Sequence, residues 1–93
     1  QTDYVTDGVR TLSVSGGDSM ATLVVGTGCS LSSLVAAFCA VSDDRLTAAA
    51  TACALAKKAA EAARSKAQGP GSFHNAYLDA LYLIQPADFT RTA

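Results

Sequence analysis

The chain has 93 residues, of which 49% are hydrophobic and 16% are charged, and this composition excludes a disordered protein. Seven basic and eight acidic side chains give a net charge of -1, so there is no basic field to attract nucleic acid or an anionic membrane surface. We expect residues 1–93 to belong to a single small domain. The charged fraction is low for so small a domain, which suggests that more protein covers some of its faces.

The three cysteines, Cys29, Cys39 and Cys53, lie among apolar or small residues and have no C-x-x-C spacing. This pattern favours free thiols in a reducing compartment. The longest apolar stretch is shorter than the roughly 20 residues of a membrane span, and no basic segment precedes an apolar run at the N-terminus. We therefore expect a cytoplasmic protein in which Cys39 and Cys53 are small core residues.

The N-terminal segment predicts a β-hairpin. Residues 4–6 and 9–15 are rich in β-branched side chains and flank Asp7-Gly8, a dipeptide that favours two-residue turns because glycine adopts positive φ. Apolar and polar residues alternate in the second of these segments. We expect one face of the hairpin to be buried and the other to be polar.

Two helical segments come next. Large apolar residues recur at three- and four-residue spacing from Cys29 to Val41, which predicts a helix that is nearly all buried, since its other faces carry only Ser, Ala and Cys. A polar break at residues 42–44 offers N-cap oxygens to a second helix of about residues 46–68. The stripe of small residues that we expect to face a neighbouring element comprises Leu46, Ala49, Ala50, Cys53, Ala56, Ala60 and Ala63.

A third helix is predicted over about residues 73–84, with Ser72 as its N-cap. Gly69-Pro70-Gly71 ends the helix before it, because glycine adopts the left-handed cap and proline cannot continue an α-helix. A hairpin followed by three helices belongs to the α/β class. Because a two-stranded sheet is marginal in isolation, we expect one flank of a larger layered α/β structure.

Several polar and aromatic residues have plain structural interpretations. We interpret the basic residues of the second helix as a solvated face that complements the helix dipole; they are Lys57, Lys58, Arg64 and Lys66. His74 is interpreted as a solvated residue, because no second ligand stands at a spacing suited to a metal ion. Tyr77 and Tyr82 are expected to be packing groups.

The segment Gly26-Thr27-Gly28-Cys29 is the motif that carries chemistry. It follows the apolar run 23–25, which we interpret as a strand, and it precedes the first helix. This arrangement aims free backbone amides at an anion, and the helix dipole adds partial positive charge. A helix N-terminus also stabilises a thiolate, so Cys29 could accept a proton. From the residues alone, an ordinary tight turn with a small residue at position 29 remains open.

Five segments together resemble the hydroxyethylthiazole kinases. They occur in the family's order and cover nearly the whole chain: Asp-Tyr-Val-Thr-Asp-Gly (3–8), Gly-Gly-Asp (16–18), Thr-Leu-Val-Val-Gly-Thr-Gly-Cys-Ser-Leu (22–31), Ala-Ala-Phe-Cys-Ala (36–40) and Gly-Pro-Gly-Ser-Phe (69–73). The resemblance implies that residues 1–93 are the C-terminal portion of a ribokinase-like α/β/α domain. It further implies ATP- and Mg2+-dependent phosphorylation of the hydroxyl of 4-methyl-5-(2-hydroxyethyl)thiazole in thiamin salvage.

The resemblance also implies roles for individual residues. Gly26, Thr27, Gly28 and Cys29 would form the anion hole, Gly26 would contact the thiazole alcohol, and Cys29 would stand where related kinases carry a catalytic Asp. The ATP-contacting Arg and the acidic residues associated with Mg2+ belong to a part of the family that this sequence lacks. We therefore expect the isolated chain to be inactive and the full-length enzyme to be a homotrimer with a pocket between subunits.

Two other functions are compatible with the residues. One is a non-catalytic binding or assembly module that keeps these elements of the kinase fold without its chemistry, which the short chain suggests. The other is a nonspecific phosphate-binding domain, which would hold phosphate at residues 26–29 without preference for a thiazole alcohol.

Overall fold

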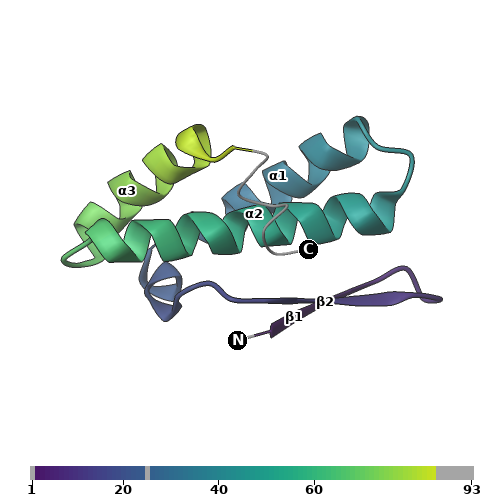
Figure 1. The fold of residues 1–93 in the computed structure, drawn as a ribbon, viewed down its shortest axis with the longest axis horizontal. Coiled ribbons are helices and arrows are strands. Elements are labelled where there is room, and N and C mark those ends of the chain that lie inside the picture. The colour runs from purple at the N-terminus through teal and green to yellow at the C-terminus, as the bar shows by residue number, and fades with distance from the viewer. Residues whose placement is uncertain (1, 25, 86–93) are drawn as a thin grey trace.

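The computed structural model describes residues 2–24 and 26–85 and places a β-hairpin before three α-helices, as expected. Its elements are β1 (Thr2–Thr6), β2 (Thr11–Ser15), the 3₁₀-helix η1 (Ser19–Leu23), α1 (Thr27–Ala40), α2 (Arg45–Lys66) and α3 (Pro70–Leu83). Helix α2 lies in the middle, with the hairpin along one side and with α1 and α3 on the other (Figure 1). None of the helices in the described ranges is long and apolar enough to cross a membrane.

The hairpin is antiparallel, with Val5 opposite Leu12 and Thr6 opposite Thr11 as the last pair. Its connection is therefore four residues long, and the predicted two-residue turn is wrong. The Asp7 carboxylate explains the difference, because its Oδ1 accepts hydrogen bonds from the N–H groups of Val9 (2.9 Å) and Arg10 (2.8 Å) and so stabilises a wider loop. Gly8 has positive φ, 93°, as predicted.

The expected burial of one hairpin face is only partial. Val14 is half-buried, but Leu12 is 37% exposed and no hairpin residue is fully buried. Helix α2 packs against both strands and is their main neighbour among the described elements. A single helix cannot cover the face of a two-stranded sheet completely, which accounts for the exposed leucine.

Helix α1 departs most from its prediction. It begins at Thr27 instead of near Cys29, and none of its residues is buried, although we expected nearly all of it to be. Its main packing partner in the described structure is α2, and the other described elements give its remaining faces little cover. The apolar residues of α1 can pack against another element, but their spacing in the sequence does not show which element covers them.

Helix α2 carries most of the core. Asp44 is its N-cap, as expected for a residue of the polar break, and accepts hydrogen bonds from the N–H groups of Leu46 (3.1 Å) and Thr47 (3.3 Å). The buried residues of the helix are Leu46, Ala48, Ala52, Leu55, Ala59, Ala60 and Ala63. The predicted stripe therefore missed the buried residues Ala48, Ala52, Leu55 and Ala59, and its members Ala49, Ala50, Cys53 and Ala56 are only half-buried. Alanine occurs on every side of this helix, so its periodicity could not identify the buried face.

Helix α3 begins earlier than predicted, with Pro70 as its first residue and Gly69 as its N-cap. Proline suits this position because it has no N–H that needs a partner. Ser72 is three residues inside the cap, and its Oγ accepts hydrogen bonds from the N–H groups of Gln68 (2.9 Å) and Gly69 (3.3 Å). The prediction that Ser72 is the N-cap is therefore wrong. Its side chain instead accepts hydrogen bonds from the two residues just before the helix.

The largest buried side chain belongs to Phe73, which has no exposed surface. Its ring stacks on that of Tyr77, with centroids 6.1 Å apart. Both pack against Ala59, Ala60 and Ala63 of α2 to form the core, and residues of η1 border it. Tyr77 is thus a packing group as predicted, whereas Tyr82 is 86% exposed and does not pack.

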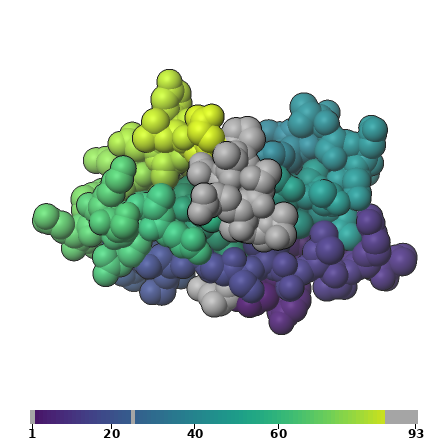
Figure 2. Space-filling model, viewed as in Figure 1, coloured from purple at the N-terminus to yellow at the C-terminus, as the bar shows by residue number. Residues whose placement is uncertain are grey.

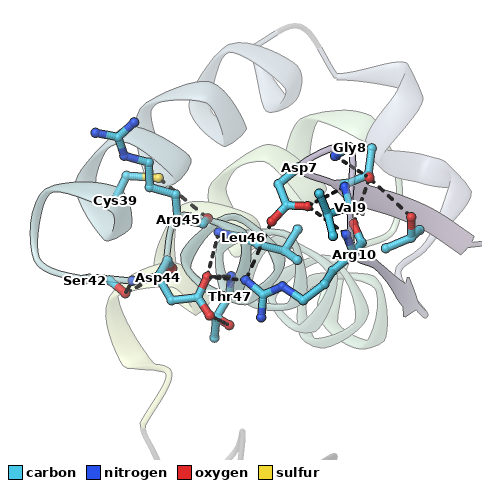
Figure 3. Close-up of polar contacts among 12 residues, drawn as sticks. Asp7, Gly8, Val9, Arg10, Cys39, Ser42, Asp44, Arg45, Leu46 and Thr47 are labelled. Atoms are coloured by element: carbon cyan, nitrogen blue, oxygen red, sulfur yellow. Dashed lines mark hydrogen bonds and ion pairs between the residues drawn. The ribbon is translucent and has the colours of Figure 1, made fainter.

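A polar network ties the hairpin loop to the start of α2 (Figure 3). Arg10 donates from Nη2 to Asp44 Oδ1 at 3.0 Å and lies 3.7 Å from Asp7 Oδ2. The hydroxyl of Thr47 donates to Asp44 Oδ2 at 2.8 Å. That hydrogen bond and the Arg10 guanidinium lower the pKa of Asp44 to about 2. The N-cap of α2 is therefore charged over most of the pH range, and it also holds the hairpin.

Candidate phosphate-binding turn

The segment from Gly26 to Cys29 forms the first turn of α1 and its cap. Gly26 is the N-cap residue, with φ of 104° in the left-handed region that favours glycine. The first helical hydrogen bond runs from the N–H of Ser30 to the carbonyl oxygen of Gly26 at 2.9 Å. No residue in the described ranges accepts a hydrogen bond from the four N–H groups of residues 26–29. They are available to an anion, as the helix N-terminus predicts.

The segment before the turn is not the predicted strand. Leu23 ends the 3₁₀-helix η1, Val24 is the C-cap of that helix, and Val25 lies outside the described residues. Asp18 caps η1, because its Oδ1 accepts a hydrogen bond from the N–H of Met20 at 2.9 Å and its carbonyl oxygen accepts one from Ala21 at 3.2 Å. These local bonds favour a helical turn over the extended conformation that a short apolar run suggests.

Thr27 connects the turn to η1. Its hydroxyl donates to the carbonyl oxygens of Ala21 (3.0 Å) and Val24 (3.3 Å). The side chain is therefore engaged with protein, and only its backbone N–H faces a potential anion. Thr27 holds the turn in place through its side chain, a role that the sequence motif did not reveal.

Gly28 occupies the second position of α1 with open space around it. A Cβ atom built at Gly28 would meet no atom within 4 Å, and the same is true at Gly26. Glycine in a helix costs up to about 1 kcal/mol relative to alanine, and no packing contact with the described residues requires it at position 28. The absence of a side chain leaves room for a ligand oxygen to approach the backbone.

A cavity of about 170 Å³ opens beside the turn. Thr27 and Gly28 line one part of it, while Gly17, Lys57 and Tyr77 are among the residues that line the rest. Neither Gly26 nor Cys29 lines this cavity. The structure thus brings two of the four candidate residues, Thr27 and Gly28, to one open cavity, while the other two are exposed outside it.

The three cysteines are free thiols, and they differ in exposure. Cys29 is exposed at the turn, whereas Cys39 and Cys53 are half-buried on α1 and α2. Burial raises the pKa of Cys53, the nearby Asp3 carboxylate adds to the rise, and the Lys57 ammonium opposes it. Of the three, Cys29 is the thiol that a ligand at the turn could contact.

The prediction of a solvated basic face on α2 is wrong for Lys57. Its side chain is 12% exposed, lies 3.2 Å from the Asp3 carboxylate and donates to the carbonyl oxygen of Gly16 at 3.3 Å. Lys66 is exposed as predicted, and so is His74 on α3. The adjacent glycines at 16 and 17 were the one signal in the sequence that a side chain approaches the backbone there.

No group of His, Cys, Asp or Glu side chains in the part of the chain that the structure describes is suited to hold a metal ion.

A hairpin, three helices and a glycine turn with free amides define this chain as part of an α/β kinase fold. A family model described as the hydroxyethylthiazole kinase family matches residues 1–87, and the chain belongs to that family.

Individual relatives agree with this assignment. A hydroxyethylthiazole kinase from Serratia proteamaculans is 55% identical over 86 residues, and one from Citrobacter koseri is 56% identical over 82 residues. Those matches cover 92% and 88% of this chain but only 33% and 31% of the relatives, so the chain spans about a third of their length. The solved hydroxyethylthiazole kinase protein from Pyrococcus horikoshii OT3 superposes with a TM-score of 0.88 at 42% identity, over 92% of this chain and 34% of that one.

Proposed function

We propose that this chain carries the phosphate-binding turn and the reactive thiol of an ATP- and Mg2+-dependent kinase that phosphorylates the hydroxyl of 4-methyl-5-(2-hydroxyethyl)thiazole in thiamin salvage. The observation that carries the proposal is the set of four backbone N–H groups at residues 26–29, which have no acceptor among the described residues. The names of the relatives support the choice of reaction and of substrate.

Each residue of the turn has a distinct part in this proposal. The N–H groups of Thr27, Gly28 and Cys29 donate to oxygens of the transferring phosphoryl group, with the dipole of α1 adding partial positive charge. Gly26 contacts the thiazole alcohol, since its missing side chain leaves the approach open. Cys29, which is exposed, takes the proton of the attacking hydroxyl. Because phosphoryl transfer depends mainly on positioning and charge neutralisation, we expect the amides to matter more than the thiol.

The turn fits the phosphates of ATP, while the described residues supply no cluster of ligands for Mg2+. Bound Mg2+ would neutralise charge on phosphate oxygens, and we assign no ligand for it to this chain. On the family resemblance we also place the intact protein in the cytoplasm as a homotrimer, with the remaining ATP and thiazole contacts made by residues outside this chain. The molar mass of the intact protein, measured by light scattering, tests the trimer.

The decisive experiment replaces Gly28 in the intact protein. A methyl group at this position would occupy the space that a phosphate oxygen needs, so Gly28→Ala should lower kcat by about 100- to 1,000-fold, the effect of losing one anion-hole donor. Since that methyl group meets no protein atom, thermal stability should be unchanged or slightly raised. ADP release dependent on the thiazole alcohol measures the rate, and thermal unfolding measures the stability.

Gly71→Ala is the matched control. Gly71 is also the second residue of its helix, and a Cβ there also meets no atom within 4 Å. It should change stability as Gly28→Ala does and leave the rate unchanged. Cys29→Ser should lower kcat less than Gly28→Ala. Full activity in Gly28→Ala would contradict the proposed role of the turn.

The same assay separates the two other functions. A non-catalytic binding or assembly module would show no ADP release in the intact protein, with or without the thiazole alcohol. A nonspecific phosphate-binding domain would bind phosphate at residues 26–29 and lose that binding in Gly28→Ala, yet it would show no preference for the thiazole alcohol.

A further inference from the structure

Three side chains of α2 hold three consecutive residues of the loop between β2 and η1. Lys57, Glu61 and Arg64 are spaced by four and three residues, which places them on one face of the helix. We call this set the α2 clamp. It reaches residues 16–18 of the loop. In the space-filling view, the hairpin and η1 form a continuous band against α2 (Figure 2).

Each member of the clamp matches the polarity of its partner. The Lys57 ammonium donates to the carbonyl oxygen of Gly16 at 3.3 Å. The Gly17 N–H donates to Glu61 Oε2 at 2.7 Å. Beyond these, Arg64 Nε lies 3.7 Å from Asp18 Oδ1. The two cations thus contact a carbonyl oxygen and a carboxylate, and the anion accepts from an amide N–H. Hydrogen bonds that involve a charged group are stronger than neutral ones.

The two glycines allow this close approach. Gly16 has φ of 112° and Gly17 has φ of 87°, both in the region that favours glycine. A Cβ at Gly16 would lie 2.5 Å from Glu61 Oε2, and one at Gly17 would lie 3.3 Å from Lys57 Cγ. Consecutive glycines would leave the loop flexible by themselves, so the side chains of α2 must supply the order that the loop backbone lacks.

A short series of contacts continues from the clamp to the phosphate-binding turn. Asp18, which pairs with Arg64, also caps η1 through the N–H of Met20. The carbonyl oxygen of Ala21 in η1 then accepts the hydrogen bond from the Thr27 hydroxyl. Thr27 is the first residue of α1 and carries one of the four free amides. The position of the turn therefore depends on η1, and the position of η1 depends on the loop that the clamp holds.

We propose that Lys57, Glu61 and Arg64 are positioning residues, which order the phosphate-binding turn through the loop at 16–18 and η1. This inference rests on the proposed function of the turn for its catalytic consequence. Misplacement of a reacting group by about 1 Å can cost about 100-fold in rate. Loss of the clamp should therefore reduce kcat much more than it changes the KM for the thiazole alcohol.

The test uses Glu61 variants of the intact protein. Glu61→Ala removes the acceptor for the Gly17 N–H, whereas Glu61→Gln keeps an oxygen there and removes only the charge. We expect Glu61→Ala to lower kcat by about 10- to 100-fold and Glu61→Gln to restore most of it. Lys66→Ala, at an exposed basic residue of the same helix, is the matched control and should behave as the unaltered protein.

Amide hydrogen exchange provides a second measurement that does not depend on kinase activity. In Glu61→Ala, peptides covering residues 16–29 should exchange faster, while peptides covering residues 43–52 at the start of α2 should not change. Unchanged exchange at residues 16–29 would overturn the proposal, and so would an equal rise in Glu61→Gln and Glu61→Ala.

The kinetic and exchange results together separate this proposal from the proposed function. Faster exchange with unchanged kcat, in a protein that Gly28→Ala inactivates, would overturn the positioning role. Faster exchange in a protein that is active with Gly28→Ala would support the ordering of the turn by the clamp and would contradict the catalytic role of the turn.

Discussion

The segment that precedes α1 is attached to α2 at two places, with similar charged groups in different surroundings. At the hairpin loop, Arg10 pairs with Asp44 at 3.0 Å, and their side chains are 56% and 43% exposed. Near the phosphate-binding turn, Lys57 pairs with Asp3 at 3.2 Å, and the lysine side chain is only 12% exposed. Asp3 is 47% exposed, about as much as Asp44, so the two pairs differ in the burial of the cation. Water screens Arg10 far more than Lys57, and we expect the two attachments to contribute unequally to stability.

The two attachments also differ in what they hold. The Arg10 network joins the hairpin loop to the helix cap of α2, where any movement would stay local. The α2 clamp holds a loop of two glycines that leads through η1 to Thr27. Similar charge pairs can therefore have different roles in one molecule. The burial of a pair, and whether its partners connect to the functional turn, decide whether it acts only locally at the surface or positions the turn.

The largest expected effect comes from adding a methyl group inside the clamp. Gly16→Ala would impose a left-handed conformation on alanine and would push a Cβ against the Glu61 carboxylate. Together these effects should lower the free energy of unfolding by about 3 kcal/mol. Chemical denaturation measures the change.

Gly8→Ala in the hairpin loop is the matched variant, since Gly8 also has positive φ but its Cβ would meet nothing within 4 Å. Gly8→Ala should lower the free energy of unfolding only by the cost of the left-handed conformation, about 1 kcal/mol. Equal losses in the two variants would show that the clamp adds nothing beyond backbone strain.

Removal of the half-buried Lys57 cation should have the next largest effect. Lys57→Met keeps most of the side-chain packing but leaves the carbonyl oxygen of Gly16 and the Asp3 carboxylate without their donor. A loss of about 2 kcal/mol is expected, because an abandoned partially buried acceptor retains its desolvation cost. Arg10→Met at the exposed attachment should cause a clearly smaller shift of the denaturation midpoint. A larger shift in Arg10→Met would reverse the comparison.

The smallest expected effect is a pH dependence at the exposed attachment. The Thr47 hydroxyl and the Arg10 guanidinium lower the pKa of Asp44 from 3.8 to about 2 in the folded protein. The stabilisation is therefore complete above about pH 4 and is lost as the pH falls through about 2. Asp44→Asn keeps a side-chain oxygen for the cap and removes the titration, so its stability should fall less between pH 4 and pH 2.

Denaturation midpoints of the two proteins across this pH range provide the measurement. The pKa of Asp7 is also lowered, chiefly by hydrogen bonds from the N–H groups of Arg10 and Val9, so Asp44→Asn should retain part of the acid sensitivity. Identical pH profiles for Asp44→Asn and the unaltered protein would show that Asp44 makes no titrating contribution.

Local signals in the sequence were sufficient for much of the architecture. The order of hairpin and helices and the cap at Asp44 follow from the conformational preferences of a few neighbouring residues. The predicted left-handed glycine cap at residues 69–71 is wrong, because α2 already ends at Lys66 with Ala67 as its C-cap and Gly69 is extended. The free amides of residues 26–29 could also be predicted from local sequence, because the start of any helix leaves its first N–H groups without internal partners. Five short segments were also enough to place the chain in the hydroxyethylthiazole kinase family.

Other features depended on contacts between residues far apart in the chain, and these were predicted poorly. Lys57 cannot be told in sequence from an exposed basic residue of the same helix such as Lys66, yet it is 12% exposed, because Asp3 and Gly16 lie opposite it across the packed hairpin. Leu23 belongs to an apolar run that suggested a strand, but the cap at Asp18 and the Thr27 hydroxyl hold this region as a 3₁₀-helix. Backbone conformation is encoded over a few residues, whereas burial and charge partners arise only when distant elements pack together.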